Sequence, residues 1–277
     1  MKFTTMKILF INESLAIAAF CLAMPNAAAA HGPLHEQILA ITQVIAQFSD
    51  SAQLYLKRGE LHRHHQDWQA AFSDFDRAER LAPSLAVVDL HRGKAWLDAG
   101  APAKAKAALN KFLSKAPNDA DGLITRARAL AQLGEHLASA EDFTRAIARV
   151  DVPVPEFYLE RAQAWYAAQC VDEALRGLDE GMASLGQIVT LQLYAIELEI
   201  EQKSYDAALA RLETVAAQSP RKEKWLARRG EILQLAGRHE EARLAFASAL
   251  REMESLPAGR RHTKATAALE RRLRAML

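Results

Sequence analysis

The stretch YLKRGELHRHHQDWQAAFSDFDRAERLAP, residues 55–83, contains the pattern that decides the fold. Within it Arg58 directly precedes Gly59. Ala71 follows twelve residues after Gly59, and Phe75 follows four residues after Ala71. The Arg-small pair recurs at Arg92-Gly93, Arg126-Ala127, Arg161-Ala162 and Arg229-Gly230, with Ala195-Ile196 filling the remaining place. Successive copies lie 34 or 35 residues apart. Self-similarity at such a period is typical of repeat proteins.

The spacing of small and large residues predicts two antiparallel helices in each repeat. Small residues at the eighth and twentieth places, such as Gly59 and Ala71, let the two helices approach closely, and a large residue at the twenty-fourth place, such as Phe75, fills the gap against the next pair. Neither helix buries its face alone, so the repeats must stack. We predict an all-α protein with six repeats, residues 52–85, 86–119, 120–154, 155–188, 189–222 and 223–256.

This pattern resembles the tetratricopeptide repeat, whose sequence of small, aromatic and proline positions is best matched by residues 55–83. The resemblance implies a right-handed α-solenoid that binds extended peptides or partner helices on the face made by the first helix of each repeat. Two departures are local: Ile196 stands where a small residue is expected, which predicts loosened packing, and the fourth repeat starts one residue late after DVPVP.

Both ends of a solenoid need a cap. Residues 31–51 carry Leu34, Ile38, Ile41 and Ile45 at helical spacing, so we predict an N-terminal capping half-repeat. Residues 257–277 offer Ala267, Leu269, Leu273 and Leu277 among arginines, which predicts a C-terminal capping helix.

The first 30 residues have the composition of a signal peptide. Lys2 and Lys7 precede a short apolar run, and Ala28-Ala29-Ala30 provides a small-residue cleavage site. We therefore expect cleavage near Ala30, a periplasmic or secreted protein beginning at His31, and no membrane insertion after cleavage. Retention of the segment as an anchor is the alternative.

Charge is balanced in the expected mature chain. Removal of Lys2 and Lys7 from the 35 basic residues, and of Glu13 from the 34 acidic ones, leaves 33 of each sign. Nucleic-acid binding requires an excess of clustered basic residues, so we expect no nucleic-acid partner. A single cysteine, Cys170, would remain, and a buried apolar role is typical of such a residue.

No catalytic motif is found: there is no nucleophile elbow, phosphate loop, dinucleotide fingerprint or paired-cysteine zinc site. We predict no catalytic residues, no cofactor, no metal site and no enzyme activity. The alternative is an accessory or metal-binding protein that uses His62, His64 and His65, because two histidines three residues apart on a helix can share a metal. His62 stands where Trp96 and Trp165 stand in other repeats, which favours a packing role.

The arginines at the seventh place form a ladder that has two interpretations. They could form an anion track, or they could pair with acidic residues of the second helices, as Arg58 with Asp74 and Arg126 with Asp142. We favour the structural ion pairs.

Binding is expected at the second, fifth, sixth, ninth, twelfth and thirteenth places of the first helices, as the resemblance implies. The charges there run from basic to acidic to basic, which predicts a protein partner, an extended or helical segment of basic or mixed charge. A self-associating structural envelope component is a further alternative. The predicted binding residues are Lys57, Arg63, His91, Lys94, Arg128, Glu156, Glu160, Tyr166, Tyr194, Glu197, Glu201 and Arg228.

Overall fold

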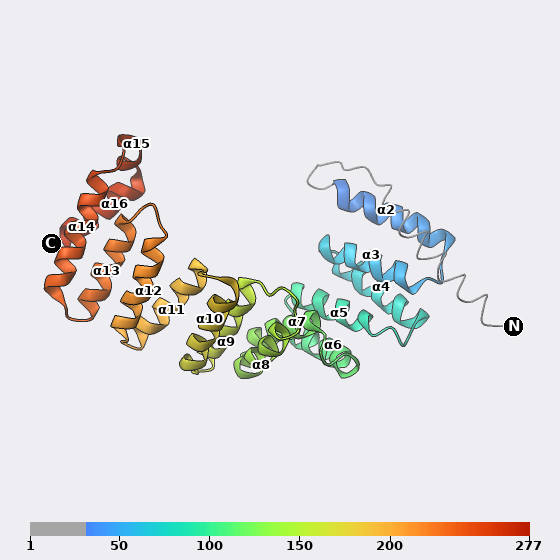
Figure 1. The fold of residues 1–277 in the computed structure, drawn as a ribbon. Helices are drawn as coiled ribbons and strands as arrows, with labels where there is room; N and C mark the ends of the chain where they lie inside the picture. The colour runs from blue at the N-terminus through green and yellow to red at the C-terminus, as the bar shows by residue number, and fades with distance from the viewer. Residues whose placement is uncertain (1–31) are drawn as a thin grey trace. The chain divides into compact units, whose positions relative to one another are not determined.

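A computed structural model describes residues 32–277, so the predicted signal peptide lies outside the described residues. The described chain divides into two compact bodies, an N-terminal body that ends at residue 99 and a C-terminal body of residues 100–277. Every regular element of the described residues is a helix, and no strand occurs among them (Figure 1). The predicted all-α class is confirmed.

The N-terminal body contains α2, α3, α4 and α5. Ile38, Ile41 and Ile45 of α2 are buried in one cluster with Leu54 and Leu61 of α3, as the capping prediction requires. Helices α3 and α4 form the two-helix pair of the first repeat. Their bounds are α2 (Gly32–Gln47), α3 (Ala52–His64), α4 (Trp68–Leu81) and α5 (Val87–Asp98).

The C-terminal body begins with α6, the second helix of the second repeat, and continues with four helix pairs and two further helices. Each pair packs on its neighbour in chain order. The bounds are α6 (Pro102–Lys115), α7 (Ala120–Gln132), α8 (His136–Ile147), α9 (Pro155–Ala167), α10 (Val171–Leu185), α11 (Val189–Glu201), α12 (Tyr205–Ala217), α13 (Glu223–Leu235), α14 (His239–Glu254), α15 (Ala258–Arg261) and α16 (Lys264–Ala275).

The turn between the two helices of each repeat has one residue in the left-handed region, always at the fifteenth place. Glycine fills this place at Gly100, Gly134 and Gly237, with φ of 72°, 77° and 74°. Glycine adopts this conformation without a side-chain clash. The other three repeats place Gln66, Gln169 and Lys203 there, with φ of 61°, 63° and 60°. The same turn geometry therefore occurs in all six repeats, including the three in which no glycine marks the turn in the sequence.

Side-chain capping fixes the starts of α4 and α7. The carboxylate of Asp67 accepts a hydrogen bond from the Ala70 backbone N at 3.2 Å, and that of Asp119 accepts one from the Gly122 backbone N at 2.7 Å. Each bond satisfies a backbone N–H that has no partner within its helix. Pro155 is the first residue of α9. Because proline has no backbone N–H, it leaves no unpaired donor at this position of the first turn.

Ile196 is accommodated in the core, although its size departs from the repeat pattern. Its side chain is 1% exposed and lies in one cluster with Ala208 and Leu212. In the first repeat the eighth place is Gly59, and the opposing twenty-fourth place is the larger Phe75. In the fifth repeat the bulkier Ile196 at the eighth place is accompanied by the smaller Leu212 at the twenty-fourth. The α11–α12 pair of this repeat is nevertheless less closely packed than α3–α4, α7–α8, α9–α10 and α13–α14.

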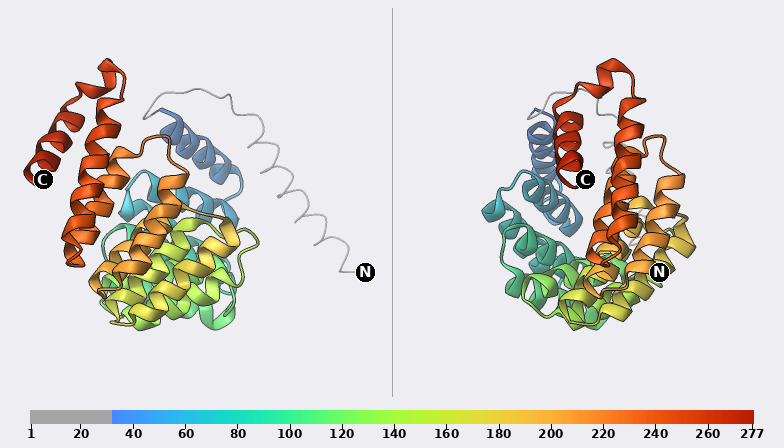
Figure 2. Two further views of the ribbon diagram at one scale, coloured as in Figure 1. Left: turned by 60° about the vertical axis from the view of Figure 1, so that its left-hand side comes forward. Right: turned by 90° about the vertical axis from the view of Figure 1, so that its left-hand side faces the viewer.

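The C-terminal cap differs from the prediction in two respects. Residues 257–277 form two helices, α15 and α16, and α16 packs along α14 (Figure 2). Leu273 is buried and Leu269 is partly buried, whereas Ala267 and Leu277 are exposed. Thr266 is buried instead, and its hydroxyl donates to the Arg260 carbonyl at 3.0 Å. No described helix has the length and apolar character needed to cross a membrane.

Candidate protein-interaction surface

The predicted binding residues lie on the first helices, α3 and α5 in the N-terminal body and α7, α9, α11 and α13 in the C-terminal body. We call the surface formed by their second, fifth, sixth, ninth, twelfth and thirteenth places the first-helix face. Each body is described separately below.

In the N-terminal body, this face is held together by contacts between α3 and α5. Glu60 Oε1 lies 3.4 Å from His91 Nδ1, and Arg63 bonds to the carboxylate of Asp98. Lys57 Nζ also lies 3.8 Å from Glu60. Several of the predicted binding groups are therefore engaged with neighbouring helices.

In the C-terminal body, two stronger pairs join consecutive first helices. Arg128 of α7 donates from Nε and Nη2 to the two oxygens of Glu160 of α9, at 2.8 and 2.9 Å. This bidentate bond raises the pKa of Arg128 above its ordinary value. Arg228 of α13 donates from Nη2 to both oxygens of Glu197 of α11, each at 2.7 Å. Two of the four predicted acidic groups are thus neutralised.

These pairs follow one rule that the sequence analysis missed. Each joins the ninth place of one repeat to the sixth place of the next: Glu60 to His91, Arg128 to Glu160 and Glu197 to Arg228. The signal in the sequence was a pair of complementary residues 31 or 32 positions apart. When the charges are grouped by helix into basic or acidic bands, the pairing between residues of consecutive first helices cannot be seen.

The centre of the face, between α9 and α11, has a different composition. Tyr166 donates its hydroxyl to Glu201 Oε2 at 2.6 Å, and this hydrogen bond is the main cause that raises the pKa of Tyr166. Tyr194 lies beside them, and burial, with smaller contributions from Tyr166 and Glu201, raises the pKa of Tyr194 to about 12. Glu156 is exposed on the first turn of α9.

No lysine or arginine of residues 32–277 forms an ion pair with Glu156 or Glu201. Glu201 therefore offers an uncompensated carboxylate beside two aromatic rings, and Glu156 offers a second one at the opposite end of α9 from Tyr166. Carboxylates attract cations, and tyrosine faces bind lysine and arginine side chains through cation–π contacts.

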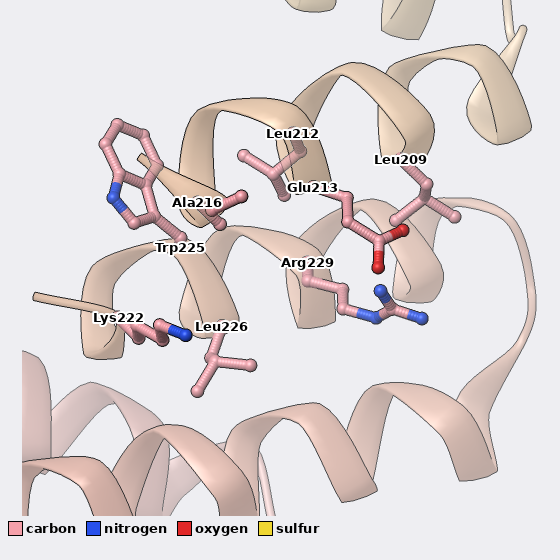
Figure 3. A pocket seen from close by; sticks show the side chains of 9 residues that line it. Leu209, Leu212, Glu213, Ala216, Lys222, Trp225, Leu226 and Arg229 are labelled. Atoms are coloured by element: carbon pink, nitrogen blue, oxygen red, sulfur yellow. The ribbon is translucent and has the colours of Figure 1, made fainter. Parts of the chain in front are cut away.

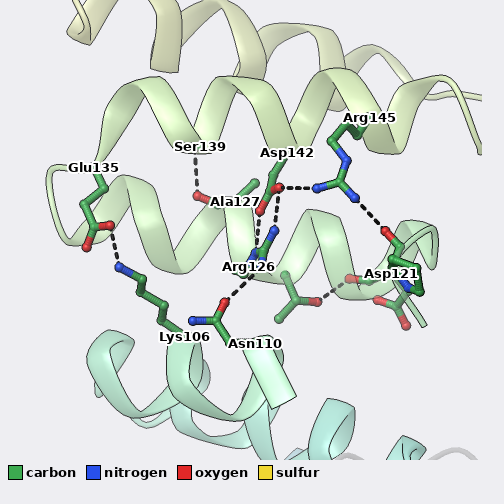
Figure 4. Close-up of polar contacts among 11 residues, drawn as sticks. Lys106, Asn110, Asp121, Arg126, Ala127, Glu135, Ser139, Asp142 and Arg145 are labelled. Carbon is green, nitrogen blue, oxygen red and sulfur yellow. Dashed lines mark hydrogen bonds and ion pairs between the residues drawn. The ribbon is translucent and has the colours of Figure 1, made fainter. Parts of the chain in front are cut away.

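The arginine ladder at the seventh place serves structural ion pairs, as predicted for Arg58 and Arg126. Arg58 donates to both oxygens of Asp74, each at 2.7 Å. Arg126 donates to Asp142 at 2.6 and 2.8 Å and also to Asn110 Oδ1 at 2.9 Å (Figure 4). Asp74 and Asp142 are both buried, and each is compensated by its arginine. An anion track is thereby excluded at these two arginines.

Two more arginines of the ladder are engaged with other partners. Arg92 bonds to Asp76 and Glu79, each at 2.9 Å, and Arg161 bonds to Glu180 at 2.7 Å and to the Gly177 carbonyl at 3.0 Å.

The histidine cluster does not converge on a common point. His62 is partly buried, with Nδ1 3.6 Å from Asp67 Oδ2, and burial lowers the pKa of His62. His64 Nε2 instead lies 3.0 Å from Arg63 Nη2, and His65 is exposed at the helix end. Within residues 32–277, no three His, Cys, Asp or Glu side chains come together in a way that could hold a metal ion.

Comparison with known sequences identifies the repeats. A family model described as Tetratricopeptide repeat matches residues 38–86 and 124–183, and one described as Tetratricopeptide repeat-like domain matches residues 160–266. The two together cover more than half of the chain. The chain belongs to the tetratricopeptide repeat family.

Several solved structures share this fold. A repeat protein from Parabacteroides merdae matches with a TM-score of 0.53 and 17% identity, covering 88% of this chain and 93% of its own. The C-terminal part of a repeat protein from Cytophaga hutchinsonii gives a TM-score of 0.64 at 14% identity, covering 85% and 94%. Pseudomonas aeruginosa pilF gives 0.51 at 12% identity, covering 82% and 97%.

Identities this low carry information on fold alone. The search of curated proteins gave no match. Tetratricopeptide repeats in general mediate protein–protein interaction, because stacked repeats present an extended binding surface.

Proposed function

We propose that this tetratricopeptide repeat protein is a non-catalytic adaptor or scaffold, located in the periplasm or secreted, that holds a segment of a partner protein on its first-helix face. The observation that carries this proposal is the centre between α9 and α11. There Glu201 lacks a cationic partner, while the flanking Glu160 and Glu197 are bonded to Arg128 and Arg228.

The partner segment is basic or of mixed charge. A lysine or arginine side chain entering the centre gains the carboxylate of Glu201 and the rings of Tyr166 and Tyr194. The flanking ion pairs present both signs of charge, which suits a segment whose own charges alternate. Tyrosine is enriched at binding hot spots because it offers a large rigid ring with a polar tip.

The test is recovery of the partner from the envelope fraction with the chain from His31, followed by binding to variants. Glu156→Gln together with Glu201→Gln is expected to weaken binding about tenfold at low salt, since a charged hydrogen bond contributes roughly 1.5–3 kcal/mol. The control is Glu240→Gln with Asp206→Asn, two exposed acidic residues on α14 and α12.

Two results would overturn the proposal. One is parental affinity in the variant that replaces Glu156, Glu160, Glu197 and Glu201 together by glutamine, with unchanged helicity and melting. The other is recovery of only further copies of this chain, with concentration-dependent sedimentation, which would indicate a self-associating structural component.

A further inference from the structure

The twelfth and thirteenth places of consecutive first helices meet at the junction between repeats. Tyr166 of α9 donates its hydroxyl to Glu201 Oε2 of α11 at 2.6 Å, and Arg63 of α3 bonds to the carboxylate of Asp98 of α5. In each pair the first residue stands at the twelfth place of its repeat. The second stands at the thirteenth place of the next repeat, 35 positions along the chain.

At the next junction of the C-terminal body, the same two places hold Ile200 of α11 and Leu235 of α13. Ile200 is partly buried against the core cluster of the fifth and sixth repeats, whereas Leu235 is 56% exposed. Covering an exposed leucine with another apolar side chain is favourable, because it removes apolar surface from water. Leu235 is therefore an exposed apolar group one repeat beyond Glu201 on the first-helix face.

Glu201 supplies a negative charge next to this apolar group. It is exposed, and no lysine or arginine of residues 32–277 forms an ion pair with it, including Lys203 in the turn that follows α11. Tyr166 bonds to its carboxylate, and Tyr194 lies beside both. A carboxylate flanked by two tyrosines favours lysine or arginine, through charge-assisted hydrogen bonds and cation–π contacts.

The separation of the two groups matches an extended segment. Packed helices lie about 8–10 Å apart, so Glu201 and Leu235, at the same place on consecutive first helices, are expected to be separated by roughly that distance. A chain in the polyproline II conformation has about three residues per turn and rises about 3.1 Å per residue. Side chains three positions apart in such a segment therefore point the same way and lie about 9 Å apart.

We propose that the partner segment binds in an extended conformation, with a lysine or arginine at Glu201 and an aliphatic side chain, three positions away, on Leu235. This inference rests on the proposed function and narrows the partner to one class, segments that carry a cation and an aliphatic residue at this spacing. The carboxylate of Glu201 selects the charge, and Leu235 fixes where along the face the segment lies.

A hollow of about 250 Å³ between α12 and α13 is a competing apolar surface (Figure 3). Leu209, Leu212 and Trp225 line it, and Glu213 and Arg229 stand together at one end. One charge of each sign at that end gives no preference for a cation. The Trp225 indole N–H signal in nuclear magnetic resonance spectra reports whether a leucine enters this hollow instead.

The test uses the full chain and blocked, proline-rich peptides of eight residues, because proline favours the polyproline II conformation. Two lead peptides carry lysine and leucine three positions apart, in the two possible orders. In one control serine replaces leucine, and in the other leucine stands next to lysine. Carbon-13 spectra of labelled tyrosine ring carbons report binding. We expect the tighter lead to displace the Tyr166 and Tyr194 signals saturably, with about fivefold lower affinity for both controls.

Three variants locate the two side chains of the peptide. Leu235→Ser is expected to remove the advantage of leucine over serine, because its apolar contact is lost. Leu244→Ser is the matched control, since it replaces a leucine that is 67% exposed on α14, and it should keep the advantage. Both leucines are exposed, so both variants should melt as the parent does. Glu201→Gln should weaken binding of each lysine peptide about tenfold.

The proposal is overturned if neither lead displaces the tyrosine signals, if leucine gives no advantage over serine, or if leucine next to lysine binds as tightly as leucine three positions away. It is also overturned if the advantage survives in Leu235→Ser, and a displaced Trp225 signal would then place the leucine in the hollow between α12 and α13.

Failure of the proposed function has a different signature. If the serine control binds the parent and binds Glu201→Gln more weakly, the first-helix face still takes a cation, and only the role of Leu235 is rejected. Lysine peptides that bind Glu201→Gln as tightly as the parent would overturn both proposals.

Discussion

The ring of Phe246 occupies the space that a side chain on Gly230 would need. A Cβ placed on Gly230 would lie 2.2 Å from Phe246 Cε1, far inside van der Waals contact. Gly59 and Phe75 have the same relationship, at 2.6 Å. In the first and sixth repeats the phenylalanine at the twenty-fourth place thus fills the space beside the glycine at the eighth.

Gly230→Ala should therefore destabilise the fold by about 1–3 kcal/mol through overpacking. Urea unfolding measures this, with Gly259→Ala as control, because a Cβ on Gly259 meets nothing within 4 Å. Adding Phe246→Leu should restore part of the loss, since Ala162 and Leu178 already provide the alanine–leucine combination at these places. Additive losses in the double variant would contradict a shared volume.

Ala242 is 1% exposed at the twentieth place, where the two helices of the sixth repeat approach closely. We expect Ala242→Leu to cost about 1–3 kcal/mol, because the added carbons force the helices apart. Ala210, exposed on α12, is the matched control for the same substitution. Equal midpoints of unfolding for both variants would show that the close approach does not limit stability.

The buried and the more exposed arginine–carboxylate pairs should contribute differently to the free energy of unfolding. Asp142 is buried, so Asp142→Ala leaves Arg126 without compensation and is expected to cost roughly 3 kcal/mol. The more exposed Arg128–Glu160 pair should give a coupling energy of about 0.2–1 kcal/mol in a double-mutant cycle. The cycle is measured by denaturant unfolding at low and at high salt, and only the exposed pair should weaken clearly with salt.

Tyrosine titration tests the centre of the first-helix face. Glu201→Gln should lower the pKa of Tyr166 towards its ordinary value, since the bond to Glu201 is the main cause of its rise. The pKa of Tyr194, about 12, should fall less, because burial is its largest cause. Carbon-13 spectra of labelled tyrosine ring carbons resolve the two groups. Equal displacements for both tyrosines would contradict the assigned causes.

The raised pKa of Tyr194 also makes stability depend on pH. The folded state keeps the proton up to about pH 12, whereas the unfolded chain loses it near pH 10. The contribution of Tyr194 is therefore fully present below pH 10 and is lost as the pH rises towards 12. Tyr194→Phe should show a shallower decline of unfolding free energy over this window.

Signal cleavage is tested by mass spectrometry of the N-terminus of protein from its native host. We expect the chain to begin at His31, because the apolar run is short and Ala28-Ala29-Ala30 follows it. Retention of Met1 or Met6 on a membrane-bound chain would reject cleavage.

The repeat fold could be predicted because it depends on residues within one repeat. The spacing of Gly59, Ala71 and Phe75 already specifies a close helix pair, and Asp74 lies where it can reach Arg58. Contacts between repeats were harder to predict, since they join residues more than 30 positions apart. The charges of Glu160 and Glu197 were visible, but their partners were not assigned.

The left-handed turn residues could not all be predicted from the sequence. Gln66, Gln169 and Lys203 adopt this conformation without the glycine that would have indicated it.

The bonds between ninth and sixth places have a consequence for the order of the repeats. Arg128 meets Glu160, whereas Glu197 meets Arg228, so the polarity reverses between the two junctions. If the fourth and sixth repeats exchanged places, Arg128 would face Arg228 and Glu197 would face Glu160, and both junctions would become repulsive. Although the repeats share one backbone plan, the third, fourth, fifth and sixth repeats are not interchangeable modules. Exchanging repeats across these two junctions should place like charges together and weaken the packing of consecutive repeats.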